Sequence, residues 1–154
     1  MNRESVLLQI NKAVETILEI TSKLDEVDLH KRPTANKYSV GELLEHIASI
    51  CAADWLISNE ATQEEMEDFY AGVSYKTIDD LQNGLVENFE SLKNNYEKLT
   101  VEELLTERTS YWGVTYTRYE WLLEILSHLY HHRGQLHAIL VHCYQKDPGV
   151  PMFE

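Results

Sequence analysis

The chain has few of the residues that mark disulfide-rich, collagen-like or low-complexity proteins. Its 154 residues include only two cysteines, three prolines and six glycines. Cys51 and Cys143 are far apart and form no Cys-x-x-Cys pair, which excludes a disulfide framework. Each lies within a helical pattern, so we expect both cysteines to pack as small apolar side chains.

Long apolar runs are also missing. The first 20 residues mix charged side chains into every turn and contain no stretch of signal-peptide or membrane-spanning length. We therefore expect a cytoplasmic protein without membrane contact. No segment rich in Pro, Gly or Ser divides the chain, and 44% of it is hydrophobic. Residues 1–154 are accordingly interpreted as one domain with one core.

Positively charged residues are also few. Thirteen Lys and Arg residues stand against 26 Asp and Glu residues, which gives a formal net charge of -13. Such a surface repels phosphate backbones and anionic lipid headgroups. Nucleic acids are therefore disfavoured as partners.

Apolar side chains recur at helical spacing in the first third of the chain. The pattern predicts a helix over about residues 4–27, and the segment 29–37, which contains Pro33, interrupts it. Ser39 and Glu42 form a capping-box pattern, so a second helix begins there. The expected inward residues of these two helices are Leu7, Ile10, Val14, Ile17, Thr21 and Leu24, followed by Leu43, His46, Ile50, Ala53 and Ile57.

The second half of the chain predicts two more long helices. Residues 61–76 are acidic and aperiodic, and Thr77 then caps a third helix. Residues 108–116 are expected to be a loop or an extended connection. The last helix covers about 117–144 and ends before the terminator sequence at 147–149. The third helix buries Leu81, Leu85, Phe89, Leu92, Tyr96 and Leu99, and the fourth turns Trp121, Ile125, His128, His132, Gln135 and Ile139 inward.

Four amphipathic helices without strand alternation predict an all-α protein, a four-helix bundle. The long connections 61–76 and 100–116 can each cross the length of a bundle, so the pattern alone leaves the order of the helices open. Gly134 interrupts the last helix despite the helix-destabilising effect of glycine. We expect it to permit close packing against a neighbouring helix.

Histidine is concentrated in the last helix, where four of the seven histidines fall between residues 128 and 137. His128 and His132 are one turn apart and differ by about 40° in direction, so both rings can bind one ion. His46 lies near the middle of the second helix, at the same depth of a bundle. We exclude the other three histidines of this region from the predicted ligand set. His131 and His137 lie away from the centre of the apolar face, and His142 is more than two turns beyond His132.

The predicted site is therefore a metal centre formed by His46, His128 and His132. Three neutral imidazoles suit Zn, Ni, Fe or Co, with Mn as a further candidate, and leave positions open for water or substrate. Neither cysteine has a spacing that would close the site. Glu124, one turn before His128, can orient a ring or take a proton, although we favour a solvated glutamate.

Two further residues of the last helix have alternative roles that the sequence leaves open. Gln135 can hydrogen-bond a ligand or a histidine. Arg133 can pair with an acidic neighbour or with the carboxylate of a substrate.

The run His128-Leu-Tyr-His131-His132-Arg133-Gly134-Gln135 resembles the His-x-x-x-His-Arg-Gly-Gln signature of the DinB-like superfamily, which includes the YfiT-type thiol transferases. The upstream histidine of that family matches His46, and the resemblance spans nearly the whole chain. It implies a four-helix bundle of up-down-down-up topology with a long crossover connection. It also implies a divalent metal on three histidines, and commonly a homodimer.

The resemblance also implies a class of activity. Characterised relatives are thiol-dependent S-transferases that use bacillithiol or mycothiol, or catalyse related isomerisations and hydrolyses. The expected function is therefore a metal-dependent transfer between a small-molecule thiol and an electrophile, or a related hydrolysis. The alternative is a non-catalytic, stress-related helical dimer in which a metal or another ligand stabilises the bundle.

Overall fold

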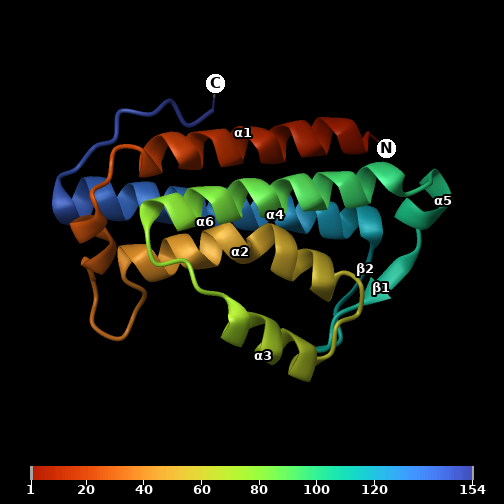
Figure 1. Ribbon diagram of the computed structural model, residues 1–154. Helices are drawn as coiled ribbons and strands as arrows, with labels where there is room; N and C mark the ends of the chain where they lie inside the picture. The colour runs from red at the N-terminus through yellow and green to blue at the C-terminus, as the bar shows by residue number, and fades with distance from the viewer. Residues whose placement is uncertain (1, 154) are drawn as a thin grey trace.

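The computed structural model describes residues 2–153, and four long helices form a bundle (Figure 1). These are α1 (Arg3–Thr21), α2 (Val40–Ile57), α4 (Ile78–Lys98) and α6 (Arg118–Ala138). Capping boxes begin α2, α4 and α6, so local hydrogen bonding fixes where each helix starts. The all-α four-helix prediction is confirmed.

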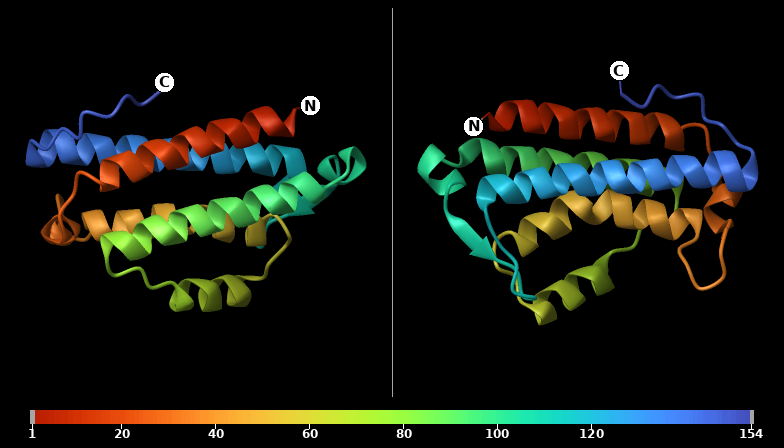
Figure 2. Two further views of the ribbon diagram at one scale, coloured as in Figure 1. Left: turned by 45° about the horizontal axis from the view of Figure 1, so that its top comes forward. Right: turned by 180° about the vertical axis from the view of Figure 1, so that it is seen from behind.

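The helices follow the up-down-down-up order. In Figure 1, α1 and α6 run from right to left, whereas α2 and α4 run from left to right. Each long helix packs on two others, α2 on α4 and α6, and α1 on α6 and α4. The crossover between the parallel helices α2 and α4 includes the short helix α3 (Gln63–Gly72), which lies outside the bundle beside α2 (Figure 2).

The connections contain more regular structure than the sequence predicts. The first helix ends at Thr21, and a 3-10 helix, η1 (Glu26–His30), follows it, because Asp25 starts a capping box of its own. Residues 61–76, read as aperiodic, contain α3. Only Met66 of α3 is buried, so this helix has no apolar stripe to detect.

The connection after α4 forms a helical turn and a small hairpin. Helix α5 (Val101–Leu104) precedes strands β1 (Glu107–Thr109) and β2 (Thr115–Thr117), which pair antiparallel. Part of the segment predicted as a loop or an extended connection is therefore extended, as the two strands of a hairpin. At the far end of α6 the helix widens into a π-helical turn, η2 (Ile139–Cys143).

The apolar stripes predicted for the first and third helices line the core. All six residues named for the first helix are buried, as are the first five named for the third. Cys51 is buried as expected, but Cys143 is exposed in η2, so the prediction for Cys143 is wrong.

Two helical glycines differ in how closely a neighbouring side chain approaches them. A Cβ at Gly134 would have no atom within 4 Å, so the prediction of close helix packing at Gly134 is wrong. Gly84, in α4, is the position of close approach, because a Cβ there would overlap the ring of Tyr75. Tyr75 belongs to the linker between α3 and α4, which is therefore held tightly against α4.

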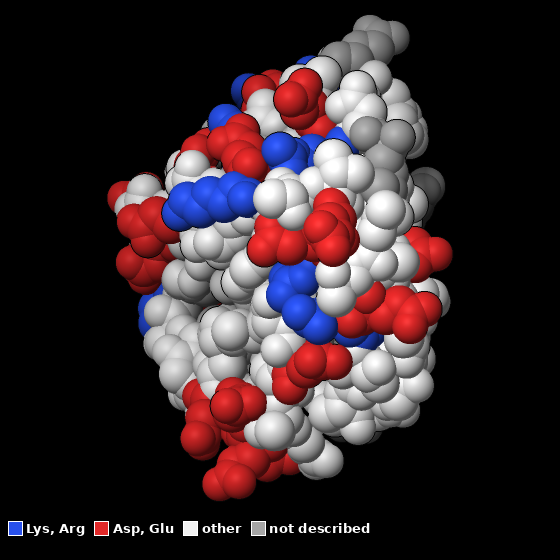
Figure 3. All heavy atoms as spheres, turned by 90° about the vertical axis from the view of Figure 1, so that its right-hand side faces the viewer, with Lys and Arg blue, Asp and Glu red and all other residues white. Residues whose placement is uncertain are grey.

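Acidic residues are twice as numerous as basic residues, 26 against 13. Figure 3 looks at the end of the bundle that carries the hairpin, where acidic groups form several separate clusters with basic groups and uncharged areas between them. None of the helices in the described part of the chain combines the length and the apolarity that a membrane span requires.

Candidate metal centre

The three predicted histidines lie on two antiparallel helices that face each other. His46 is in the second turn of α2, and His128 and His132 are in the middle of α6. The capping boxes at Ser39 and Thr117 set the starts of the two helices. Because α2 and α6 pack side by side, the three rings meet across a single helix interface.

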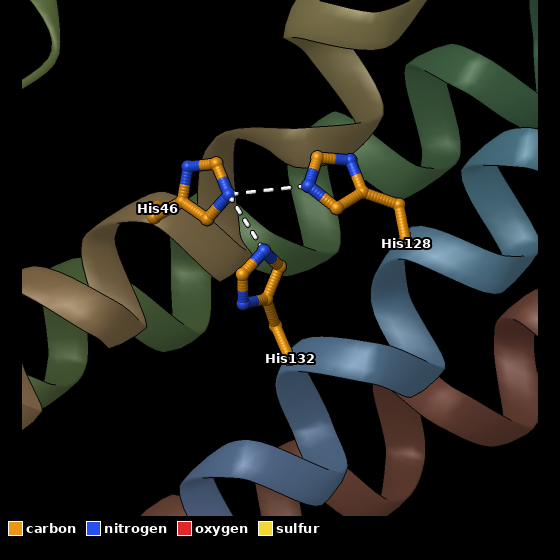
Figure 4. Close-up of side chains that lie close together, drawn as sticks. All are labelled: His46, His128 and His132. Carbon is orange, nitrogen blue, oxygen red and sulfur yellow. Dashed lines mark hydrogen bonds between the residues drawn. The ribbon is translucent and has the colours of Figure 1, made fainter.

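Each of the three rings turns its Nε2 atom toward the other two rings. The Nε2 atom of His46 lies 3.2 Å from the Nε2 atoms of both His128 and His132 (Figure 4). The three ligand atoms all lie within 4.8 Å of one another. This geometry brings together three imidazole nitrogens as a group that can hold a metal ion.

The site lies at the border of the core. His46, His128 and His132 are each partly buried. The fully buried residues of α6 are Leu122, Ile125, Leu129 and Leu136, and Leu140 of η2 continues this line. The two histidines of α6 are therefore beside the inward stripe and not at its centre, and Gln135 is exposed. This displacement leaves the rings within reach of solvent and small molecules.

Two polar side chains, Asp54 and Gln135, orient the rings of His128 and His132 through the Nδ1 atoms, on the side of each ring away from the cluster. The Nδ1 atom of His128 donates to Oδ2 of Asp54 at 2.8 Å, and the Nδ1 atom of His132 donates to Oε1 of Gln135 at 2.8 Å. Both partners are acceptors through these oxygens, so the proton of each neutral ring is on Nδ1. The Nε2 atom of each ring therefore presents a lone pair toward His46.

This donor set fits a cation. Two lone pairs point at the Nε2 atom of His46, which can donate at most one proton and so can satisfy only one of them. With the proton of His46 on Nδ1 as well, three Nε2 lone pairs face a common point. A divalent ion satisfies all three, and the hydrogen bonds that His128 and His132 donate to Asp54 and Gln135 are the kind that support metal-bound histidines.

The surroundings favour neutral rings on two of the three histidines. Burial, together with the neighbouring His132 and His128, lowers the pKa of His46 to about 4. Burial also lowers the pKa of His132. Burial acts in the same direction on His128, but the hydrogen bond and charge of Asp54 outweigh it and raise the pKa of His128. Neutral imidazole is the form that binds metal.

Asp54 was not predicted from the sequence. It is 8% exposed and is the one charged residue between His46 and Glu60, in an otherwise apolar and uncharged part of the chain. A lone carboxylate in such a stretch needs a buried partner, and that was the available signal. Glu124 is exposed and acts on His128 only through its charge, in agreement with the preferred solvated role.

The remaining candidates lie outside the cluster. His131 and His142 are exposed. Among residues 2–153, the only group of His, Cys, Asp or Glu side chains close enough together to hold a metal ion is that of His46, His128 and His132. Arg133 is 2% exposed and packs against α1, where it donates to Oγ1 of Thr16 at 2.8 Å. Its guanidinium group also lies over the ring of Tyr130, a residue of α6. No carboxylate in the described part of the chain pairs with Arg133.

Comparison with known proteins gives a consistent result. A family model described as the DinB superfamily matches residues 9–136. A candidate member of the DinB family from Exiguobacterium sibiricum has 32% identical residues and a TM-score of 0.76, over 86% of this chain and 85% of that chain. No curated protein matches the chain.

Two further crystal structures share the fold at lower identity. A DinB-like protein of Bacillus cereus is 17% identical, with a TM-score of 0.71 over 89% of both chains. A DinB-like protein of Bacillus subtilis is 20% identical, with a TM-score of 0.73 over 97% of both chains.

Proposed function

Because this chain belongs to the DinB superfamily, we propose that it binds a divalent metal ion on His46, His128 and His132 and uses it in a thiol-dependent S-transfer or a related hydrolysis. The observation that carries the proposal is the convergence of three Nε2 atoms from two helices. The ion is Zn, Ni, Fe, Co or Mn, because imidazole nitrogen accepts all of these.

The chemistry follows from an open coordination site. A divalent ion on three imidazoles lowers the pKa of a bound thiol or water, which supplies a nucleophile near neutral pH. The protein contributes orientation: Asp54 fixes the ring of His128, and Gln135 fixes the ring of His132. The thiol substrate is a small molecule such as bacillithiol, and the second substrate is an electrophile.

The first experiment measures bound metal by elemental analysis of tag-free protein, before and after reconstitution with each candidate ion. We expect about one ion per chain in the unaltered protein and a loss of stoichiometric binding in His46→Ala, His128→Ala and His132→Ala. His131→Ala is the matched control, because His131 is exposed, adjacent to His132 and outside the cluster. Absence of bound metal after every reconstitution would refute the proposed centre.

The second experiment measures turnover. Consumption of an electrophile such as monochlorobimane is followed with bacillithiol, cysteine and coenzyme A as alternative thiols. Turnover that disappears on chelation and returns with metal supports S-transfer. Stoichiometric metal binding without turnover across these thiols, and without hydrolysis of ester substrates, would favour the non-catalytic alternative, in which the ion only stabilises the bundle.

A further inference from the structure

A cavity of about 640 Å³ opens directly beside the three-histidine cluster. It lies where the connection that precedes α2 meets the end of α6, and His132 and Gln135 form part of its wall. Pro33, Leu43 and Ile139 give it an apolar wall. A volume of this size falls within the range of sites for small organic ligands.

The charge of this cavity is opposite to that of the protein. Acidic residues outnumber basic ones by 26 to 13 over the whole chain, yet no described Asp or Glu lines the cavity, and Lys37 does. A second cavity, of about 510 Å³, lies on the other side of Tyr38 and borders His46. That cavity is lined by Glu42 and Glu45 and by no described Lys or Arg.

Lys37 is the free cation at this position. Glu42, the acidic neighbour in the adjoining groove, is held by Arg32 through contacts of 2.9 Å. Lys37 forms no ion pair with any residue in the 2–153 range. An unpaired ammonium next to an apolar wall suits a ligand that carries a carboxylate on an apolar body.

We propose that the cavity binds a small organic carboxylate, with its carboxylate at Lys37 and its apolar part against Leu43 and Ile139, close to His132. On the His46 side the carboxylate of Glu45, which forms no ion pair with a described residue, repels the same molecule, so the carboxylate-bearing reactant reaches the three histidines from the Lys37 side. The identification of this ligand as a reactant rests on the proposed function. The binding preference itself rests on the cavity alone.

The test compares two probes of nearly equal size, naphthalene-1-acetate and its neutral amide, on protein stripped of metal with a chelator. We expect the carboxylate to bind more tightly by about fivefold at low ionic strength, in the range that partly exposed ion pairs give. Calorimetric or NMR titration measures both dissociation constants. The preference should vanish in Lys37→Gln and persist in Lys37→Arg.

Lys98→Gln is the matched control, because Lys98 is an exposed lysine in the last turn of α4, at the opposite end of the bundle. Equal affinity for the acid and the amide, or an unchanged preference in Lys37→Gln, would overturn the proposal. A preference lost equally in Lys98→Gln would also overturn it, because general electrostatics would then explain the effect.

Cys143 reports where the probe binds. It is an exposed thiol in the wall of the cavity, whereas Cys51 is buried. Naphthalene-1-acetate should therefore slow the reaction of Cys143 with iodoacetamide, measured by mass spectrometry of the native protein. An unchanged rate at saturating probe would place the ligand elsewhere and refute the site.

The two proposals fail in different ways. Loss of the carboxylate preference in a protein that still binds metal refutes the cavity proposal and leaves the metal centre standing. A carboxylate preference in a protein that binds no metal after reconstitution supports the cavity as a binding site and removes its role in the proposed reaction.

Discussion

At the scale of single residues, the candidate centre depends on which nitrogen of each ring faces the common point. The spacing of His128 and His132 along a helix was sufficient to predict that their rings converge, since residues four apart are neighbours on a helix. The hydrogen bond from His128 to Asp54 joins α6 to α2. Because it depends on how two helices face each other, no spacing within one helix could reveal it.

Asp54→Asn tests this supporting interaction. The amide lacks the charge that holds the proton of His128 on Nδ1, so we expect metal affinity to fall by about 10- to 100-fold, the range for such supporting partners. Asp68→Asn is the control, because Asp68 is an exposed carboxylate on α3. Competition with a chromophoric chelator measures the dissociation constants. Equal affinity of the two variants would show that Asp54 does not support the centre.

At the scale of elements, the sequence predicted the helices that carry apolar stripes and missed the one that does not. The starts at Ser39 and Thr77 were recognisable because capping residues precede periodic apolar positions. Thr62 begins a capping box of the same kind, but α3 buries so little that no periodicity follows. Packing contacts such as that of Tyr75 on Gly84 join residues from different elements and leave no periodic signal.

Gly84→Ala and Gly134→Ala should change stability in opposite directions. Alanine favours a helix over glycine by about 1 kcal/mol, and nothing opposes this gain at Gly134, where a Cβ meets open space. At Gly84 the Cβ would displace Tyr75, whose hydroxyl accepts from Asn88. Overpacking of this kind costs about 1 to 3 kcal/mol, so a net loss is expected.

Urea unfolding followed by circular dichroism gives both free energies of unfolding. Double substitution of Gly84→Ala with Tyr75→Ala serves as a control, because removal of the ring relieves the overlap and should make the alanine at position 84 favourable. If Gly84→Ala stabilised the protein in the presence of Tyr75, the packing of the linker on α4 would be contradicted.

At the scale of the whole molecule, the topology depends on connections that the helical pattern left open. The resemblance to the family supplied the up-down-down-up order, and the structure agrees with it. The single domain, the cytoplasmic location and the homodimer stay predictions. The ion pair between Lys146 and Asp28 connects the segment after η2 to η1. The sequence did not predict this ion pair, because the two residues are separated by 118 positions.

The ion pair of Asp28 with Lys146 predicts that the protein loses stability in acid. Asp28, in η1, is buried and accepts from Lys31 at 2.6 Å and from Lys146, which follows η2. Burial on its own raises the pKa of Asp28, but these hydrogen bonds outweigh it and hold the pKa well below its ordinary value of 3.8. The contribution of the carboxylate is therefore complete above about pH 4 and is lost as the pH falls through the folded-state pKa.

Asp28→Asn should lower the free energy of unfolding at pH 7 by about 1.5 to 3 kcal/mol, the range for a hydrogen bond to a charged group. Below pH 4 the difference from the unaltered protein should shrink, because the carboxyl group of Asp28 then takes up a proton in the unfolded state before it does so in the folded state, which favours unfolding of the unaltered protein. Urea unfolding from pH 7 to pH 3 measures this difference, with Asp68→Asn as the exposed control. A difference that stayed constant over this range would mean that the ionised carboxylate does not join the 3-10 helix to the end of the chain.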